Sequence, residues 1–264
     1  MANPFLHNRL DILLNKGMKR VTCILLSVFL GITFASYAQN HSYKYQYRMV
    51  RLDSTYDAKL DPGLVKYFER HKARLDKKMN EVIGHCEVTL NVESPKSPLS
   101  DLLTGLLLND GPSAIRQEAC DLSILNFGGI RTNLQAGDVT VGDIFKVSPF
   151  DNYLVVITVK GSELRKAVNR FRLDALMAAS AGMEVSYKNN VPDRIMIQGK
   201  ELQDDALYRL ITLNFIAEGG DNILDGIQYE NTEYSMLIFR DFLIDEVKKI
   251  TKSGKSVSDG FAKN

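Results

Sequence analysis

Two glycine-containing loops carry the side chains that suit a phosphorylated ring compound. Residues 126–131 (Asn-Phe-Gly-Gly-Ile-Arg) follow the apolar run 122–125, and residues 214–221 (Asn-Phe-Ile-Ala-Glu-Gly-Gly-Asp) follow the run 208–213. Glycine lets a backbone approach a ligand closely, and arginine offers a planar fork of donors to phosphate. Aromatic side chains in loops can stack on a flat ring. Together these residue types indicate a nucleotide-sized site, whereas either loop alone would favour an ordinary turn with core aromatic residues.

The elements that must position these loops follow from hydrophobic periodicity and from helix-capping residues. Continuous or alternating apolar residues predict strands at 85–92, 121–127, 153–160, 183–187, 194–197 and 208–213. Helical spacing predicts helices at 61–83, 98–109, 163–171 and 233–250. Strands and helices interleave, so we expect an α/β (α+β) fold with a mixed sheet flanked by helices. No linker divides residues 61–250, which we expect to form one domain, with an irregular lead-in at 39–60 and a loose tail at 251–264.

Taken together, the motifs resemble the C-terminal domain of the 5′-nucleotidases. The resemblance covers about residues 64–247, and its motifs are residues 126–131, 136–138 (Ala-Gly-Asp), 149–152 (Pro-Phe-Asp-Asn), 155–161, 214–215 and 219–221 (Gly-Gly-Asp). It implies a stand-alone substrate-recognition domain of the 5′-nucleotidase type. It also implies that residues 61–83 correspond to the helix that links this domain to a metal-binding domain in two-domain nucleotidases.

For the phosphate end of the site, the resemblance implies that Arg131 contacts the substrate phosphate. The neighbouring Gly128 and Gly129 would free backbone N–H groups to help, and Asn126 would hydrogen-bond the ligand in support. Without the resemblance, we would interpret Arg131 as a surface arginine. The alternative for Asn126 is a turn residue that bonds its own backbone. Phe127 departs from the family pattern, in which glycine is usual, and its ring narrows this end of the expected pocket.

For the base and ribose, the resemblance implies that Phe150 and Phe215 stack on the two faces of the base. Asn152 would bond the base edge, and Asp221 would accept from the ribose hydroxyls, a usual role for a carboxylate at a sugar. Core packing is the alternative for both rings. We favour stacking because both lie beside polar loop residues and not in the middle of a strand.

The catalytic half of such an enzyme is missing from the sequence pattern. A two-metal centre needs several His, Asp and Asn ligands, but the four histidines are His7, His41, His71 and His85, and no Asp-x-His or Gly-Asn-His stretch occurs. We therefore expect no metal site and no hydrolysis by this chain alone. Divalent metals would belong to a separate metallophosphatase chain. Residues 88–97, directly before the helix at 98–109, contain only one cation, Lys96, whereas family enzymes often place further arginines there.

The N-terminus resembles an export signal. A basic stretch from Met18 precedes the uncharged, mostly apolar residues 21–34, and small residues follow up to Ala38, which is the secretory pattern. We expect residues 1–38 to be a leader, with Met18 as a possible true start, and a periplasmic or extracellular mature protein. The apolar run is shorter than the roughly 20 residues of a bilayer span, so we expect no membrane span after processing.

Charge and cysteine content narrow the possible partners. The 33 Lys and Arg residues nearly balance the 32 Asp and Glu residues, which provides no electrostatic footprint for nucleic acid. Of the three cysteines, Cys86 and Cys120 would remain after processing. Two free thiols are the expected state, and a bridge between them is the alternative.

Three hypotheses follow for the function. The first is an exported nucleotide-binding or nucleoside-binding module that works with a metallophosphatase chain in nucleotide catabolism. The second is an interaction module that kept the fold and lost the ligand, for which Phe127 and the missing arginines argue. The third is a hydrolase that acts alone through residues that no motif marks.

Overall fold

The computed structural model describes residues 21, 45–51, 53–55, 60–94, 96–172 and 178–259. The chain divides into two units, Met1–Leu60 and Asp61–Asn264. The predicted leader lies outside the described residues except for Val21, and residues 45–51 form neither helix nor strand. No described helix combines the length and apolarity that a membrane span requires.

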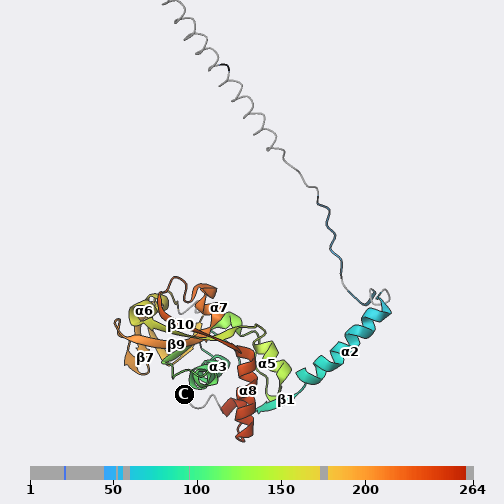
Figure 1. Cartoon of the computed structure of the whole chain (residues 1–264). Coiled ribbons are helices and arrows are strands. Elements are labelled where there is room, and N and C mark those ends of the chain that lie inside the picture. Colours follow the sequence, from blue (N-terminus) through green and yellow to red (C-terminus); the bar gives the residue numbers. More distant parts are fainter. Residues whose placement is uncertain are drawn as a thin grey trace, which may run out of the picture. The chain divides into compact units, whose positions relative to one another are not determined.

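A five-stranded sheet forms the centre of the second unit (Figure 1). Its order is β10 (Tyr229–Ile238), β4 (Tyr153–Lys160), β9 (Leu207–Leu213), β2 (Leu122–Asn126) and β5 (Ala178–Ala181). β2 and β9 are parallel, whereas the other neighbours are antiparallel. The predicted mixed sheet is therefore confirmed.

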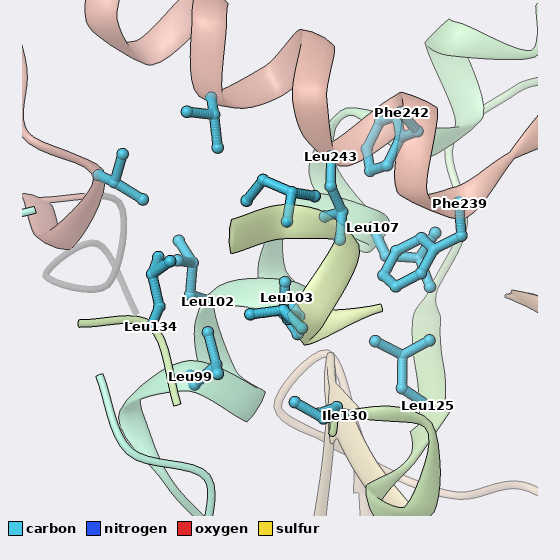
Figure 2. Close-up of a cluster of buried hydrophobic side chains, with 14 of the residues drawn as sticks. Leu99, Leu102, Leu103, Leu107, Leu125, Ile130, Leu134, Phe239, Phe242 and Leu243 are labelled. Carbon is cyan, nitrogen blue, oxygen red and sulfur yellow. The ribbon is translucent and has the colours of Figure 1, made fainter. Parts of the chain in front are cut away.

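Alternating side chains of the sheet enter two separate cores. In β4, Leu154 and Val156 belong to one core, and Val155 and Ile157 belong to the other, as the two-residue period of a strand requires. The first core is completed by α3 (Pro98–Asn109), α5 (Val141–Val147) and α8 (Phe239–Lys252). Figure 2 shows labelled side chains of α3 and α8 converging in this first core.

The second core lies under α6 (Gly161–Val168), α7 (Asn214–Ala217) and a small antiparallel sheet. That sheet consists of β6 (Met183–Lys188), β7 (Val191–Ile197) and β8 (Lys200–Glu201). The short helix α4 (Gly111–Ala114) follows α3. The whole sheet is thus covered on both faces, which leaves its strand ends as the places where loops can form a site.

α2 (Pro62–Met79) begins as expected but ends earlier. The Asp61 carboxylate accepts a hydrogen bond from Leu64 N at 2.9 Å, and Pro62 occupies the first helical position. The predicted continuation to residue 83 is wrong, because β1 (Val82–Cys86) pairs with β3 (Gly137–Thr140). The β-branched Val82 and Ile83 suit a strand better than a helix. Residues 87–92 form no strand, only a bridge of Leu90 to Leu134.

The predicted last helix at 233–250 is also corrected. Residues 229–238 form the strand β10, which pairs with β4, and α8 starts at Phe239. Backbone pairing along the edge of the sheet outweighs the helical spacing of the apolar residues here. The expected loose tail differs as well, since Ser256 and Val257 are buried and Ser256 Oγ donates to His85 O at 3.1 Å. α6 starts and ends before the predicted limits 163 and 171.

Cys86 and Cys120 are both free. Cys86 is buried and Cys120 is half-buried. Burial raises the pKa of the Cys120 thiol to about 11 and also raises the pKa of Cys86, so both thiols are protonated and unreactive at neutral pH.

Candidate functional site

The ends of three neighbouring strands, β2, β9 and β4, lie together along one side of the central sheet, which is called its edge below; this side is distinct from the outermost strand β10. β2 ends at Asn126 beside the parallel strand β9, which ends at Leu213. β4 begins at Tyr153 and runs antiparallel to β9, with Leu154 opposite Leu213. Tyr153 N donates to the Asn214 side-chain oxygen at 2.8 Å and ties the two loops together. All eight predicted site residues therefore lie in loops that adjoin this edge. Two of these loops follow β2 and β9, and the third leads into β4.

The loop after β2 is built around the side chain of Asn126. This side chain is buried, and its Nδ2 donates to Asp221 Oδ2 at 2.7 Å. The chain then makes one turn of 3₁₀ helix at Phe127–Gly129. A Cβ atom on Gly129 would lie 2.7 Å from Asn126 Oδ1, so only glycine fits this position unless Asn126 moves. Among the described residues, Asn126 Oδ1 has no hydrogen-bond partner.

Asp221 has a strained backbone. Its φ is 53°, in the left-handed region, and the φ of the next residue, Asn222, is 55°. Non-glycine residues adopt this conformation at a cost, and such strain concentrates at functional sites. The bond from Asn126 holds the carboxylate on the inner side of the loop, so the loops after β2 and β9 are joined by a direct contact.

Arg131 lies on the exposed side of the same loop. Its Nη1 donates to Gly128 O at 3.1 Å, and its backbone N donates to Val147 O at 2.9 Å at the end of α5. Within the described part of the chain, Arg131 makes no ion pair. Most donors of its guanidinium fork are thus directed to solvent.

Phe150 and Phe215 are exposed, with 44% and 40% of their surfaces accessible. Large apolar rings at such positions are not core residues, which removes the alternative of simple core packing. A Cβ atom on Gly220 would lie 2.5 Å from the Phe215 ring, so this ring rests against the Gly220 backbone. In the described residues, the two phenylalanine rings make no ring contact with each other.

Two cavities lie close to this edge. A cavity of about 10 Å³, enough for about one water molecule, is lined by Asn126, Gly129 and Asn152 among other residues. Asn152 thereby joins the residues that the fold brings together. Ala178, which pairs with Asn126 across β5 and β2, lines a larger cavity of about 300 Å³ with Lys96.

Lys96, the lone cation noted before the helix at 98–109, is already engaged at the larger cavity. Its Nζ lies 3.5 Å from Asp101 Oδ2. Burial raises the pKa of the Asp101 carboxyl. Lys96 therefore faces a carboxylate at short range, which weakens it as a ligand for a second anion.

Sequence reasoning missed two residues that hold the loops in place. Asn214 belongs to the motif 214–215, yet its side chain bonds Tyr153 N, 61 residues away. No pattern in the neighbouring sequence marks that bond. Arg240 fell inside the helix predicted at 233–250. In the structure Arg240 is buried, and its guanidinium donates to Pro149 O at 3.0 Å and to Asp151 Oδ1 at 2.5 Å.

The site has the chemistry of binding. It offers amide, carboxylate and guanidinium groups together with two exposed rings. In the described ranges, no group of three or more His, Cys, Asp or Glu side chains could hold a metal ion. The hydrogen-bonding groups and the two exposed rings can together hold a polar, ring-containing ligand.

Comparison with known proteins agrees with this architecture. The family model of the 5′-nucleotidase, C-terminal domain, matches residues 82–226, more than half of the chain. The chain is 32% identical to "Protein UshA" of Yersinia enterocolitica over 180 residues, covering 65% of this chain and 32% of that protein. It is 26% identical to a 5′-nucleotidase of Vibrio cholerae, covering 73% of this chain and 36% of that protein.

A solved structure has the same fold. The 5′-nucleotidase precursor from Thermus thermophilus matches with a TM-score of 0.57 and 26% identity, over 71% of this chain and 39% of that chain. The chain spans about a third of the length of the curated relatives. The matched family model covers both the β2 and the β9 loops. The chain therefore belongs to the family of 5′-nucleotidase C-terminal domains.

Proposed function

We propose that the edge formed by β2, β9 and β4 binds a nucleotide or nucleoside. The observation that carries this proposal is the convergence of three loops at this edge of the sheet. Two of these loops are joined by the 2.7 Å hydrogen bond between Asn126 and Asp221. Ligands of open α/β sheets bind outside the carboxyl ends of strands, and β2 and β9 both end here. The exposure of Phe150 and Phe215 adds flat apolar surface at the same edge.

In this proposal, the exposed guanidinium of Arg131 and the backbone N–H groups around Gly128 and Gly129 bind phosphate. Phe150 and Phe215 stack on the base. Stacking on both faces of the base requires the two rings to reach it from separate loops. Because both rings are exposed, a ligand can contact them.

The polar groups would fix the orientation of the ligand. Asn152 bonds the base edge, and Asp221 accepts from ribose hydroxyls. Asn126 supports the site by holding Asp221 at 2.7 Å. Its unpaired, buried Oδ1 is a further acceptor beside this carboxylate.

Calorimetric titration of AMP and adenosine into residues 39–264 tests the proposal. Binding at or below millimolar ligand is expected. Phe215→Ala should raise Kd by about tenfold, since stacking on an aromatic ring contributes roughly 1–3 kcal/mol per base. Tyr234→Ala is the matched control, because Tyr234 is an exposed ring on the edge strand β10. Absence of heat at millimolar ligand, or equal effects of the two variants, would refute nucleotide binding.

A separate metallophosphatase chain would supply the catalytic half, with divalent metals bound only there. The chain matches about a third of the Yersinia enterocolitica and Vibrio cholerae relatives, and none of the 18 residues of α2 is buried. Leu64, Phe68 and Leu75 are each about half exposed and recur at helical spacing on one face. A helix of this length gains most of its stability from burying such a face, so α2 is the docking helix in this proposal.

The docking proposal has its own test. α2 carries six Lys and Arg against two Asp and Glu, so the partner surface should be acidic around an apolar groove. The neighbouring reading frame should encode Asp-x-His and Gly-Asn-His motifs. A co-purification experiment should lose the partner when Phe68→Glu is introduced, whereas Tyr234→Glu should retain it. Equal retention by both variants would contradict docking through α2.

Export of the mature protein to the periplasm or the exterior completes the proposal. The basic stretch followed by apolar residues 21–34 and small residues to Ala38 supports it. N-terminal sequencing of the exported product should find a start at residue 39.

The alternative is an interaction module without a ligand. Its supporting observation is Phe127, a half-buried ring in the 3₁₀ turn beside Gly128. This alternative predicts a bound partner but no calorimetric heat with AMP or adenosine, so the titration above separates the two functions.

A further inference from the structure

Arg240 connects the start of α8 to the loop that carries Phe150. It lies in the first turn of α8 and is 7% exposed. Its Nη1 donates to Pro149 O at 3.0 Å and to Phe150 O at 3.4 Å, and its Nη2 donates to Asp151 Oδ1 at 2.5 Å. Three consecutive residues of one loop are thus bound by a single guanidinium.

The same loop has a second tie to α8. Phe239 N donates to Asn152 O at 2.8 Å, directly before Tyr153 begins β4. The Arg240 guanidinium also lies 4.1 Å above the ring of Phe145 in α5, a favourable cation–π distance. The backbone of residues 149–152 is therefore fixed to the core, while the ring of Phe150 is exposed.

The cost of this arrangement argues for a role beyond stability. The buried guanidinium of Arg240 loses its hydration, and its partner Asp151 is largely exposed, so the ion pair offsets little of that cost. Arg240 Nε also has no hydrogen-bond partner in the described residues, which adds an unpaired buried donor. An arginine that served stability alone would gain little here, whereas its planar fork suits three acceptors on one loop.

We infer that Arg240 is a positioning residue that presents the Phe150 ring to a flat ligand. The part of this inference that concerns a ligand rests on the proposed function. The ordering of the loop by Arg240 does not depend on it. Without the guanidinium, the loop would become ordered only when the ligand binds. The conformational entropy lost in that step would weaken the binding affinity. Asp151 supplies a side-chain acceptor for Arg240, and its 69% exposed side chain can be removed without opening the core. The bonds of Arg240 to Pro149 O and Phe150 O would remain.

The first experiment follows the loop and uses no ligand. The chain contains no tryptophan, so Phe150→Trp places a single tryptophan on the loop, which can be excited selectively at wavelengths that tyrosine does not absorb. Adding Arg240→Met should lower the anisotropy of this fluorophore and raise its quenching by acrylamide, and adding Asp151→Ala should do so more weakly. Arg165→Met is the matched control, because Arg165 also bonds one carboxylate, of Asp204, and one backbone carbonyl, of Leu202. Unchanged anisotropy in both Arg240→Met and Asp151→Ala, or equal changes in Arg165→Met, would overturn the inference.

The second experiment separates positioning from general stability. Arg240→Met in the full chain should raise Kd for adenosine by about threefold to tenfold, the cost of ordering one or two side chains on binding. Kd for ribose 5-phosphate, which has no base to stack, should change less than twofold. Arg240→Lys retains the charge without the fork and should fall between wild type and Arg240→Met.

The two experiments fail in different ways. If wild type binds neither adenosine nor ribose 5-phosphate, the proposed function is wrong, and the fluorescence of the Phe150→Trp variant still decides whether Arg240 orders the loop. If both ligands weaken equally in Arg240→Met, the residue acts on the whole site and the positioning role is wrong.

Discussion

The amide of Asn126 donates to the carboxylate of Asp221 across 2.7 Å, although 95 residues separate them in sequence. This bond joins the loop after β2 to the loop after β9. It also holds a carboxylate whose residue has a left-handed backbone. The structure thus places the carboxylate of a residue with a strained backbone beside Gly128.

Replacing Asn126 with alanine should loosen both loops. Asn126→Ala removes a buried donor to a charged acceptor, so the free energy of unfolding should fall by about 1–2 kcal/mol. Urea unfolding followed by circular dichroism measures this change. Asn231→Ala is the control, because its exposed amide donates to Glu233 on the edge strand β10, and its effect should stay within about 0.5 kcal/mol. Equal effects of the two variants would show that the Asn126 bond does not hold the loops.

Gly220 and Gly128 should respond differently to alanine. A Cβ atom on Gly220 would lie 2.5 Å from Phe215 O and from the Phe215 ring, whereas one on Gly128 would lie 3.4 Å from Asp221 Oδ2. Gly220→Ala should therefore destabilise the protein by about 1–3 kcal/mol and displace the Phe215 ring. Gly128→Ala should change stability by no more than about 1 kcal/mol. Thermal unfolding compares the two variants, and a larger loss from Gly128→Ala would contradict the packing of Phe215 on Gly220.

Elements with strong local signals could be predicted from sequence. α3 occupies the predicted residues 98–109, since Ser97 and Ser100 cap its start reciprocally and Pro98 follows. β4 occupies the predicted residues 153–160, because a run of β-branched and apolar residues buried on both faces has no other suitable structure.

Elements decided by distant partners could not be predicted. Met236 and Leu237 continue the helical spacing of the residues after Phe239, yet both lie in β10, which pairs with β4, and Met236 is exposed. The contacts of Arg240 join positions about 90 residues apart, so no local pattern marks them. The resemblance to 5′-nucleotidases predicted the loops of the proposed site, but only the structure reveals that Asn126 bonds Asp221.

Metal removal should leave ligand binding unchanged. Because the described residues contain no group of three metal-binding side chains, Kd for adenosine should be the same with and without EDTA. AMP should release no phosphate when Mn²⁺ or Zn²⁺ is added to the chain alone. Phosphate release that EDTA and Arg131→Ala both abolish would instead favour a hydrolase that acts by itself.

Glu246 should make stability depend on pH. Burial raises the pKa of this carboxyl, and the hydrogen bond from Lys249 Nζ at 2.5 Å only partly opposes the rise. The folded-state pKa therefore exceeds the unfolded value of about 4.3. The stability that Glu246 contributes relative to Glu246→Gln should be complete below the unfolded pKa. It should be lost as pH rises through the raised folded pKa, because the folded protein then has to ionise a buried group.

Urea unfolding of wild type and Glu246→Gln from pH 3 to pH 8 measures this dependence. The difference in the free energy of unfolding, wild type minus variant, should fall with pH and then level off. Asp241→Asn is the control, since Asp241 is exposed in the first turn of α8 and lacks the burial that raises the pKa of Glu246. An equal fall in the Asp241→Asn comparison would contradict burial of Glu246 as the cause. A Glu246 difference that rises with pH would mean that the bond to Lys249 outweighs burial.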